Sequence, residues 1–227
     1  CRQMLDAIGV RSVEDLFADI PAAVRLKRPL RIPPALSEAD LAKVMGSLAT
    51  KNADVNRYSS FLGAGCYNHF SPAIIGHLIS RGEFLTAYTP YQPEISQGTL
   101  QTMYEYQTLI CQLTGMEVSN ASMYEGASAT AEAILMAHRV TGRNDVVVAR
   151  SVHPVYRQVT HTYARQINLS FQEVPFTPAG TADVKQAKKL LSDKAACLVV
   201  QNPNFFGAVE DLTEMAQAAH SVGALLV

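Results

Sequence analysis

The sequence has little net charge, few cysteines and no long apolar run, and each shortage excludes a class of protein. Its 227 residues carry a net charge of −1, so no basic surface indicates a nucleic acid or an anionic membrane as partner. The four cysteines form no Cys-x-x-Cys pair, which favours a reducing cytoplasm over a disulfide scaffold. No apolar run reaches the length of a membrane span, and no signal peptide opens the chain. We expect a cytoplasmic protein with no nucleic-acid or membrane partner.

The sequence also lacks the common motifs of metal sites and activated nucleophiles. It has six histidines but no His-Glu-x-x-His motif, no Cys/His cluster and no Gly-x-Ser-x-Gly motif. Gly63 and Gly65 lack the third glycine of a dinucleotide-binding turn, and no predicted strand precedes them. We therefore expect no metal site and no dinucleotide site.

What the chain does contain is an apolar fraction of 48%, enough for a substantial core. From residue 99 onward, amphipathic helical patterns alternate with short apolar strands. Helices are predicted at 99–114, 127–140, 154–166, 182–192 and 212–221. Strands are predicted at 145–149, 169–174, 197–200 and 224–227. This alternation is typical of a mainly parallel sheet covered by helices on both faces, so the sequence predicts an α/β fold.

The first 60 residues predict helices separated by proline-containing breaks. Ser12 and Ser37 each open a capping-box pattern, in which an acidic residue stands three positions later. The second box precedes an apolar stripe made of Leu41, Val44, Met45 and Leu48. We interpret 1–60 as an N-terminal helical arm or cap, and 61–227 as part of a large α/β domain, with Pro72 opening a helix that runs to Ile79.

Both ends of the sequence suggest a piece of a longer protein. Residue 1 is Cys rather than Met, and Val227 lies inside a predicted buried strand. Domain boundaries normally fall in exposed linkers. We expect the chain to be truncated before the end of its large domain.

Residues 88–98 read Tyr-Thr-Pro-Tyr-Gln-Pro-Glu-Ile-Ser-Gln-Gly and form the most informative segment. Pro90 and Pro93 fix φ and disfavour helix at the residue before each of them. A core strand would not accept two prolines. We interpret the segment as a preformed wall of a polar site, and its candidate site residues are Tyr88, Thr89, Tyr91 and Gln92.

Three further candidates should lie near the carboxyl ends of strands, where open α/β sheets bind ligands. Ser128 lies in a small-residue turn that opens a helix, so the turn either attracts a phosphate or allows close helix packing. Glu125 disfavours the first alternative through like-charge repulsion. His153 follows the strand 145–149 and either lines the site or caps a helix. Asn202 precedes Pro203 and either contacts a ligand or makes an ordinary turn.

Residues 88–98, followed by 99–115, closely resemble the P-protein, or glycine decarboxylase, of the glycine cleavage system. The resemblance covers nearly the whole chain, and the turn from Glu125 to Ser128 narrows it to subunit 1 of the two-subunit form. It implies the pyridoxal phosphate (PLP)-dependent transferase fold of the aspartate aminotransferase type, fold type I. In that fold type the Ser128 turn would hold the cofactor phosphate, His153 would stack on the pyridine ring, and Asn202 would meet the phenolate oxygen.

The chain offers no convincing lysine for the Schiff base that PLP chemistry of this class requires. Its seven lysines are predicted in helices, in loops or at the wrong end of a strand: Lys27, Lys43, Lys51, Lys185, Lys188, Lys189 and Lys194. In this fold type the lysine follows a strand beyond the one that ends at Val227, so the expected truncation would already remove it. Separately, the resemblance implies that subunit 1 lacks this lysine and that subunit 2 binds PLP covalently. This chain would then carry no catalytic residue, support the active site of its partner in a heterotetramer, and be inactive alone.

The implied reaction is the decarboxylation of glycine, followed by transfer of the aminomethyl group to the lipoyl arm of H-protein. The expected partners are therefore glycine dehydrogenase subunit 2 and lipoylated H-protein. Two alternatives remain open. The chain could be half of a self-sufficient PLP-dependent aminotransferase or lyase whose lysine lies downstream, or it could belong to a purely structural subunit.

Overall fold

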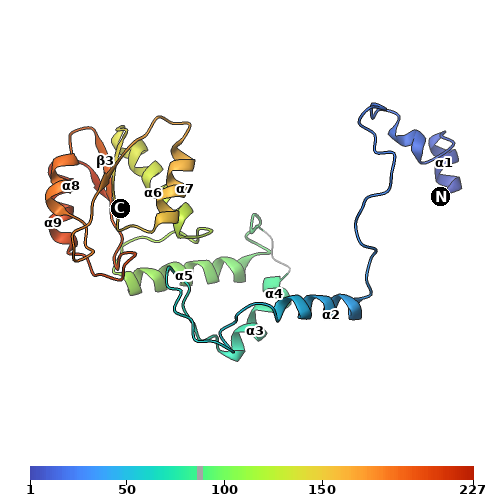
Figure 1. Cartoon of the computed structure of the whole chain (residues 1–227), viewed down its shortest axis with the longest axis horizontal. Coiled ribbons are helices and arrows are strands. Elements are labelled where there is room, and N and C mark those ends of the chain that lie inside the picture. Colours follow the sequence, from blue (N-terminus) through green and yellow to red (C-terminus); the bar gives the residue numbers. More distant parts are fainter. Residues whose placement is uncertain (86–88) are drawn as a thin grey trace. The chain divides into compact units, whose positions relative to one another are not determined.

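The computed structural model describes residues 1–85 and 89–227 (Figure 1). The described residues form two compact units, 1–59 and 60–227. Among them, no helix is both long enough and apolar enough to cross a bilayer.

The first unit contains two α-helices and one 3₁₀ turn: α1 (Arg2–Ile8), η1 (Glu14–Phe17) and α2 (Glu38–Ala49). The helix α1, which ends at Gly9 with φ +84°, was not predicted. The first capping box forms, since Ser12 and Asp15 exchange two hydrogen bonds, but the turn that it opens is only four residues long. At α2 the Ser37 hydroxyl accepts the Asp40 N–H at 3.2 Å. The apolar stripe of α2 is exposed in this unit.

The second unit begins with three helices and continues as alternating helices and strands. The leading helices are α3 (Ala73–Ile79), α4 (Gly82–Leu85) and α5 (Gln97–Thr114). The later helices are α6 (Gly126–Thr141), α7 (Pro154–Ala164), α8 (Val184–Leu190) and α9 (Leu212–Ser221). The strands are β1 (Asp145–Ala149), β2 (Ser170–Val174), β3 (Ala195–Val199) and β4 (Leu225–Leu226).

These bounds confirm the predicted alternation and correct it at three places. Pro72 is the N-cap of α3, not its first residue, because its ψ of 141° is extended. The short helix α4 was not predicted. The helix α8 begins after Asp183, two residues later than predicted. Asp183 is its extended N-cap, and its carboxylate accepts the Gln186 N–H at 3.1 Å.

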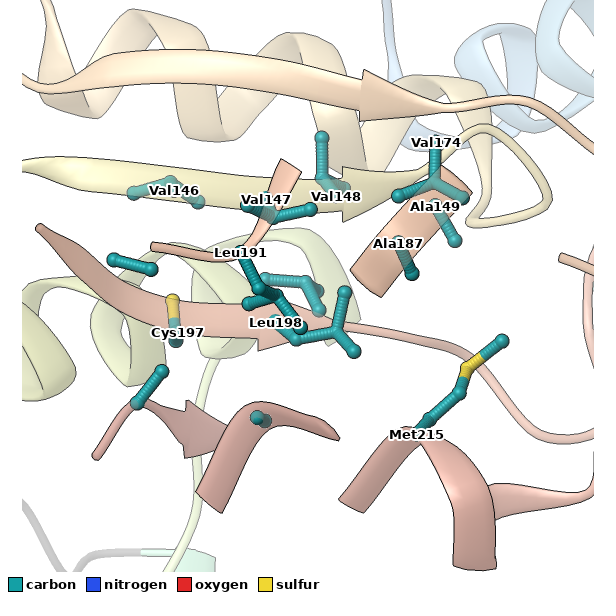
Figure 2. Close-up of a cluster of buried hydrophobic side chains, with 14 of the residues drawn as sticks. Val146, Val147, Val148, Ala149, Val174, Ala187, Leu191, Cys197, Leu198 and Met215 are labelled. Carbon is teal, nitrogen blue, oxygen red and sulfur yellow. The ribbon is translucent and has the colours of Figure 1, made fainter. Parts of the chain in front are cut away.

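The four strands form one parallel sheet in the order β2-β1-β3-β4. The helices α8 and α9 cover one face, and α6 and α7 cover the other (Figure 1). The fully buried core lies along β1 and β3, where Val147 and Leu198 pair across the sheet and pack near Leu191 and Met215 (Figure 2). Each such side chain contributes about 1.5–3 kcal/mol by burial. This core holds the carboxyl ends of the strands in a fixed arrangement.

Candidate functional site

A cavity of about 290 Å³ lies at the carboxyl ends of β3 and β4. It combines the first two turns of α6, the loop after β1, the start of α7 and the residues that follow β3 and β4. Most of the lining is apolar: Ala129, Thr130, Ala133, Val152, Tyr156, Val199, Val200, Gln201 and Val227. This is the edge of the sheet at which the sequence predicts a site.

The turn that opens α6 is capped by its own first residue. The two carboxylate oxygens of Glu125 accept the N–H groups of Ala127 at 2.5 Å and of Ser128 at 2.9 Å. The Ser128 hydroxyl donates to the carbonyl oxygen of Glu125 at 3.0 Å. The hydroxyl of Ser128 and the N–H groups of Ala127 and Ser128 therefore already have partners within the chain.

Tyr156 of α7 lies directly against this turn. A Cβ atom added to Gly126 would stand 2.3 Å from the Tyr156 hydroxyl oxygen and 2.6 Å from the adjacent ring carbon. A larger residue at 126 would therefore force the tyrosine ring to move. The ring fills the space beside the first turn of α6.

His153 caps α7 and joins three loops. Its Nδ1 accepts the Val155 N–H at 3.1 Å, and its Nε2 lies 3.4 Å from the Ala64 carbonyl oxygen. An acceptor at Nδ1 requires the tautomer with hydrogen on Nε2, which can then donate to Ala64. The ring stacks on Tyr156 at 4.8 Å between centroids and meets the edge of Phe205 at 4.9 Å. The structure thus shows the helix-capping alternative, and stacking of His153 on a cofactor ring stays a prediction.

The loop after β3 is held by hydrogen bonds to the loop after β1 and to the residues that precede α9. The Gln201 side-chain oxygen accepts the His153 N–H at 2.8 Å, which links this loop to the one after β1. The Asn202 side-chain oxygen accepts the Glu210 N–H at 3.0 Å, so Asn202 stabilises its own turn. The sequence analysis missed Gln201, whose position directly after a buried strand was the available signal.

Glu210 is the second residue that the sequence analysis missed. The residue is 6% exposed, and its carboxylate accepts hydrogen bonds from the Ser151 hydroxyl at 3.1 Å, the Asn204 amide at 2.7 Å and the Ala182 N–H at 3.1 Å. These donors follow β1, β3 and β2, respectively. One buried carboxylate therefore connects the loops after three strands, and no local sequence pattern indicates it.

The polar segment with two prolines lies apart from these contacts. Tyr88 is outside the described residues. Tyr91 is 84% exposed, its N–H donates to the Thr89 carbonyl oxygen at 2.8 Å, and the Gln92 carbonyl oxygen accepts the Ser96 N–H at 3.1 Å. Among the described residues, no hydrogen bond connects this segment to the α6 turn or to the strand ends. The binding roles of its residues stay predictions.

A second cavity, of about 500 Å³, lies between α4 and the start of α5, and Ile95, Ser96 and Gly98 of this segment line part of it. Arg81 and Glu83 line it and form an ion pair at 2.5 Å, with both side chains about half exposed or more. Such an exposed pair contributes little to stability. The cavity is larger than the one at the strand ends, but its only charged lining residues already pair with each other.

The lysines and metal-binding side chains add no reactive group to either cavity. All seven lysines are exposed, and none lines a cavity described above. Within residues 1–85 and 89–227, no group of three or more His, Cys, Asp or Glu side chains is arranged to hold a metal ion.

Comparisons with known proteins agree with the resemblance found in the sequence. The family model described as "Glycine cleavage system P-protein" matches residues 1–227. Proteins named "Probable glycine dehydrogenase (decarboxylating) subunit 1" from Geobacillus kaustophilus and Brevibacillus brevis are 50% and 51% identical over 226 residues, which is 100% of this chain. The chain spans about half the length of these curated relatives, 50% in both cases.

Solved structures support the same grouping. The chain matches a crystal structure of glycine decarboxylase (P-protein) of the glycine cleavage system, in inhibitor-bound form, with a TM-score of 0.86 and 44% identity over 99% of this chain and 50% of that one. A sphingosine-1-phosphate lyase from Burkholderia pseudomallei has a TM-score of 0.59 at 12% identity, covering 91% of this chain and 50% of that one, and shares the fold alone. The predicted α/β class and fold type I are confirmed.

Proposed function

The chain belongs to the glycine cleavage system P-protein family, and from this premise we propose that it forms part of subunit 1 of a glycine decarboxylase. The complex removes carbon dioxide from glycine and passes the aminomethyl group to the lipoyl arm of H-protein. The match of all 227 residues to the family model carries this proposal. The relatives named subunit 1 support a second subunit as partner.

PLP supplies enzymes of this kind with an electron sink for the carbanion that decarboxylation leaves. The residues of this chain do not fit that cofactor. A cofactor phosphate at the start of α6 would need free N–H groups, but those of Ala127 and Ser128 are bound to the Glu125 carboxylate. We therefore assign the cofactor to the partner subunit and a supporting role to this chain.

In this role, the chain supplies a shaped surface rather than a reactive group. Glu210 holds the loops after three strands, and His153 holds the loop around Ala64. The segment with Tyr88, Thr89, Tyr91 and Gln92 presents hydroxyl and amide groups, which suit the carboxylate of glycine or a phosphate. We propose that this segment borders the partner's active site.

The assignment of the cofactor is tested by reductive trapping. The full-length protein is mixed with PLP, with and without subunit 2, and treated with borohydride, and the modified lysine is located by peptide mass. We expect a label on subunit 2 only. A labelled lysine in this chain's own protein would identify a self-sufficient PLP enzyme and contradict the assignment.

The role of the polar segment is tested by Tyr91→Phe in the full complex, measured as exchange of bicarbonate carbon into glycine. Loss of a hydrogen bond to a charged group costs about 1.5–3 kcal/mol, so exchange should fall about tenfold or more. Tyr163→Phe, on α7, is the matched control and should leave the rate unchanged. Equal rates for both variants would remove Tyr91 from the mechanism. Stability of this subunit without its partner, together with no response to added ligand, would instead support a purely structural subunit.

A further inference from the structure

The start of α6 has the features that normally attract a phosphate, but a carboxylate of the same chain already binds its N–H groups. A helix of 16 residues begins at Gly126 with small residues beside a cavity at the strand ends. Free N–H groups at such a position form a common anion site. Here the N–H groups of Ala127 and Ser128 point to the two carboxylate oxygens of Glu125.

The hydroxyl groups of the same turn are also engaged. Ser128 donates to the Glu125 carbonyl oxygen at 3.0 Å, and Thr130 donates to the Gly126 carbonyl oxygen at 2.7 Å. The Tyr156 ring occupies the space against Gly126. A phosphate that approached the N–H groups of Ala127 and Ser128 would have to displace the Glu125 carboxylate that accepts both of them.

The charge of Glu125 adds to this steric exclusion. The Ser128 hydroxyl, followed by the N–H groups of Ser128 and Ala127, lowers the pKa of Glu125 from the ordinary carboxyl value, against an opposing desolvation effect. The group therefore stays negatively charged at neutral pH. Like charges at close range repel, so the carboxylate opposes a phosphate even before any displacement.

We infer that Glu125 is a built-in anion that closes the α6 turn to phosphate monoesters, so that the chain keeps the fold of a PLP enzyme while excluding the cofactor. This inference rests on the proposed function, because it gives the physical reason for which the cofactor belongs to the partner. It also makes a separate claim: the turn regains anion binding when the carboxylate is removed.

The test uses full-length protein and inorganic phosphate as the probe. Phosphate affinity is measured by equilibrium dialysis at constant ionic strength for wild type, Glu125→Ser and Glu125→Asp. Serine caps helices without charge, whereas aspartate keeps both the cap and the charge. We expect Glu125→Ser to bind phosphate at least tenfold more tightly than wild type, and Glu125→Asp to remain at the wild-type level. The affinity of Glu125→Ser for PLP should increase in the same way, whereas its affinity for unphosphorylated pyridoxal should not change.

Two further variants keep the test decisive. Asp211→Ser removes the carboxylate that caps α9, where Asp211 accepts the Thr213 N–H at 3.0 Å. An equal gain of affinity in this variant would show a general property of helix ends and overturn the inference. If circular dichroism shows that Glu125→Ser does not fold, the neutral isostere Glu125→Gln replaces it. A neutral variant that folds but binds phosphate only as tightly as wild type overturns the inference. Reductive trapping tests the assignment of PLP to the partner independently of phosphate binding. A negative phosphate result therefore leaves that assignment in place, and a negative trapping result leaves the role of Glu125 in place.

Discussion

The Ser151 hydroxyl donates to Oε1 of Glu210 at 3.1 Å, although the two residues stand 59 positions apart in the chain. Ser151 follows β1, and Glu210 lies in the loop between β3 and α9. Both side chains are buried. Because the same carboxylate also accepts hydrogen bonds from Asn204 and Ala182, it connects the loops after three strands.

Replacement of this carboxylate by its neutral isostere tests the connection. In Glu210→Gln, one carboxylate oxygen is replaced by an NH₂ group. This group cannot accept the hydrogen bonds that the surrounding hydroxyl and N–H groups donate. An unsatisfied buried polar group costs about 1–3 kcal/mol, so the free energy of unfolding should fall by about 2 kcal/mol in urea titrations.

Glu214→Gln is the matched control for this change. Glu214 pairs with Lys188 at 2.6 Å on the surface, with both side chains about half exposed. Loss of an exposed ion pair changes stability by less than about 1 kcal/mol. Equal effects of the two substitutions would contradict the structural role of Glu210.

Gly126→Ala should destabilise the start of α6 through Tyr156. The added methyl group would overlap the tyrosine ring, and such overpacking costs about 1–3 kcal/mol. Combining it with Tyr156→Ala should remove this additional cost, which a double-mutant cycle on unfolding free energies measures. Gly46→Ala in α2 meets no atom within 4 Å and should be neutral or stabilising by up to about 1 kcal/mol. Additive effects at 126 and 156 would show that the two residues do not meet.

Cys197 should resist thiol reagents in the folded protein. It is fully buried on β3, and burial raises its pKa to about 12, so the reactive thiolate is scarce at neutral pH. Cys1 and Cys66 are exposed and should react with maleimide. Mass mapping before and after denaturation in guanidinium checks this, and rapid labelling of Cys197 in native protein would argue against a tightly packed β3.

Glu125 should make stability depend on pH in the acid range. Its pKa is lower in the folded chain than the ordinary value of 4.5, so its stabilising contribution is present above that value and is lost as the pH falls through the folded pKa. Relative to Glu125→Gln, the wild-type protein should therefore lose stability below about pH 4.5 and keep a constant difference near pH 7. If the stability advantage of wild type over Glu125→Gln instead grew as the pH falls, the result would contradict the capping geometry.

Much of the architecture followed from local patterns. The apolar strands, the helices between them and the Ser37 cap were predictable because side-chain periodicity and capping depend on residues only a few positions apart. The parallel sheet followed from the alternation itself. The resemblance that indicated the family likewise rested on short contiguous segments, 88–115 and the turn 125–128.

The sequence by itself thus determined the class of fold, the bounds of most elements and the family, since these depend on short-range order. Only the tertiary structure decided which polar groups meet. Glu125 was visible as an awkward neighbour for a phosphate, but its hydrogen bonds to two N–H groups depend on the backbone path into α6. The strand order β2-β1-β3-β4 and the carboxylate of Glu210 bring together loops that are distant in the chain. Buried polar groups must find partners wherever the fold places them, and that placement is not encoded in local spacing.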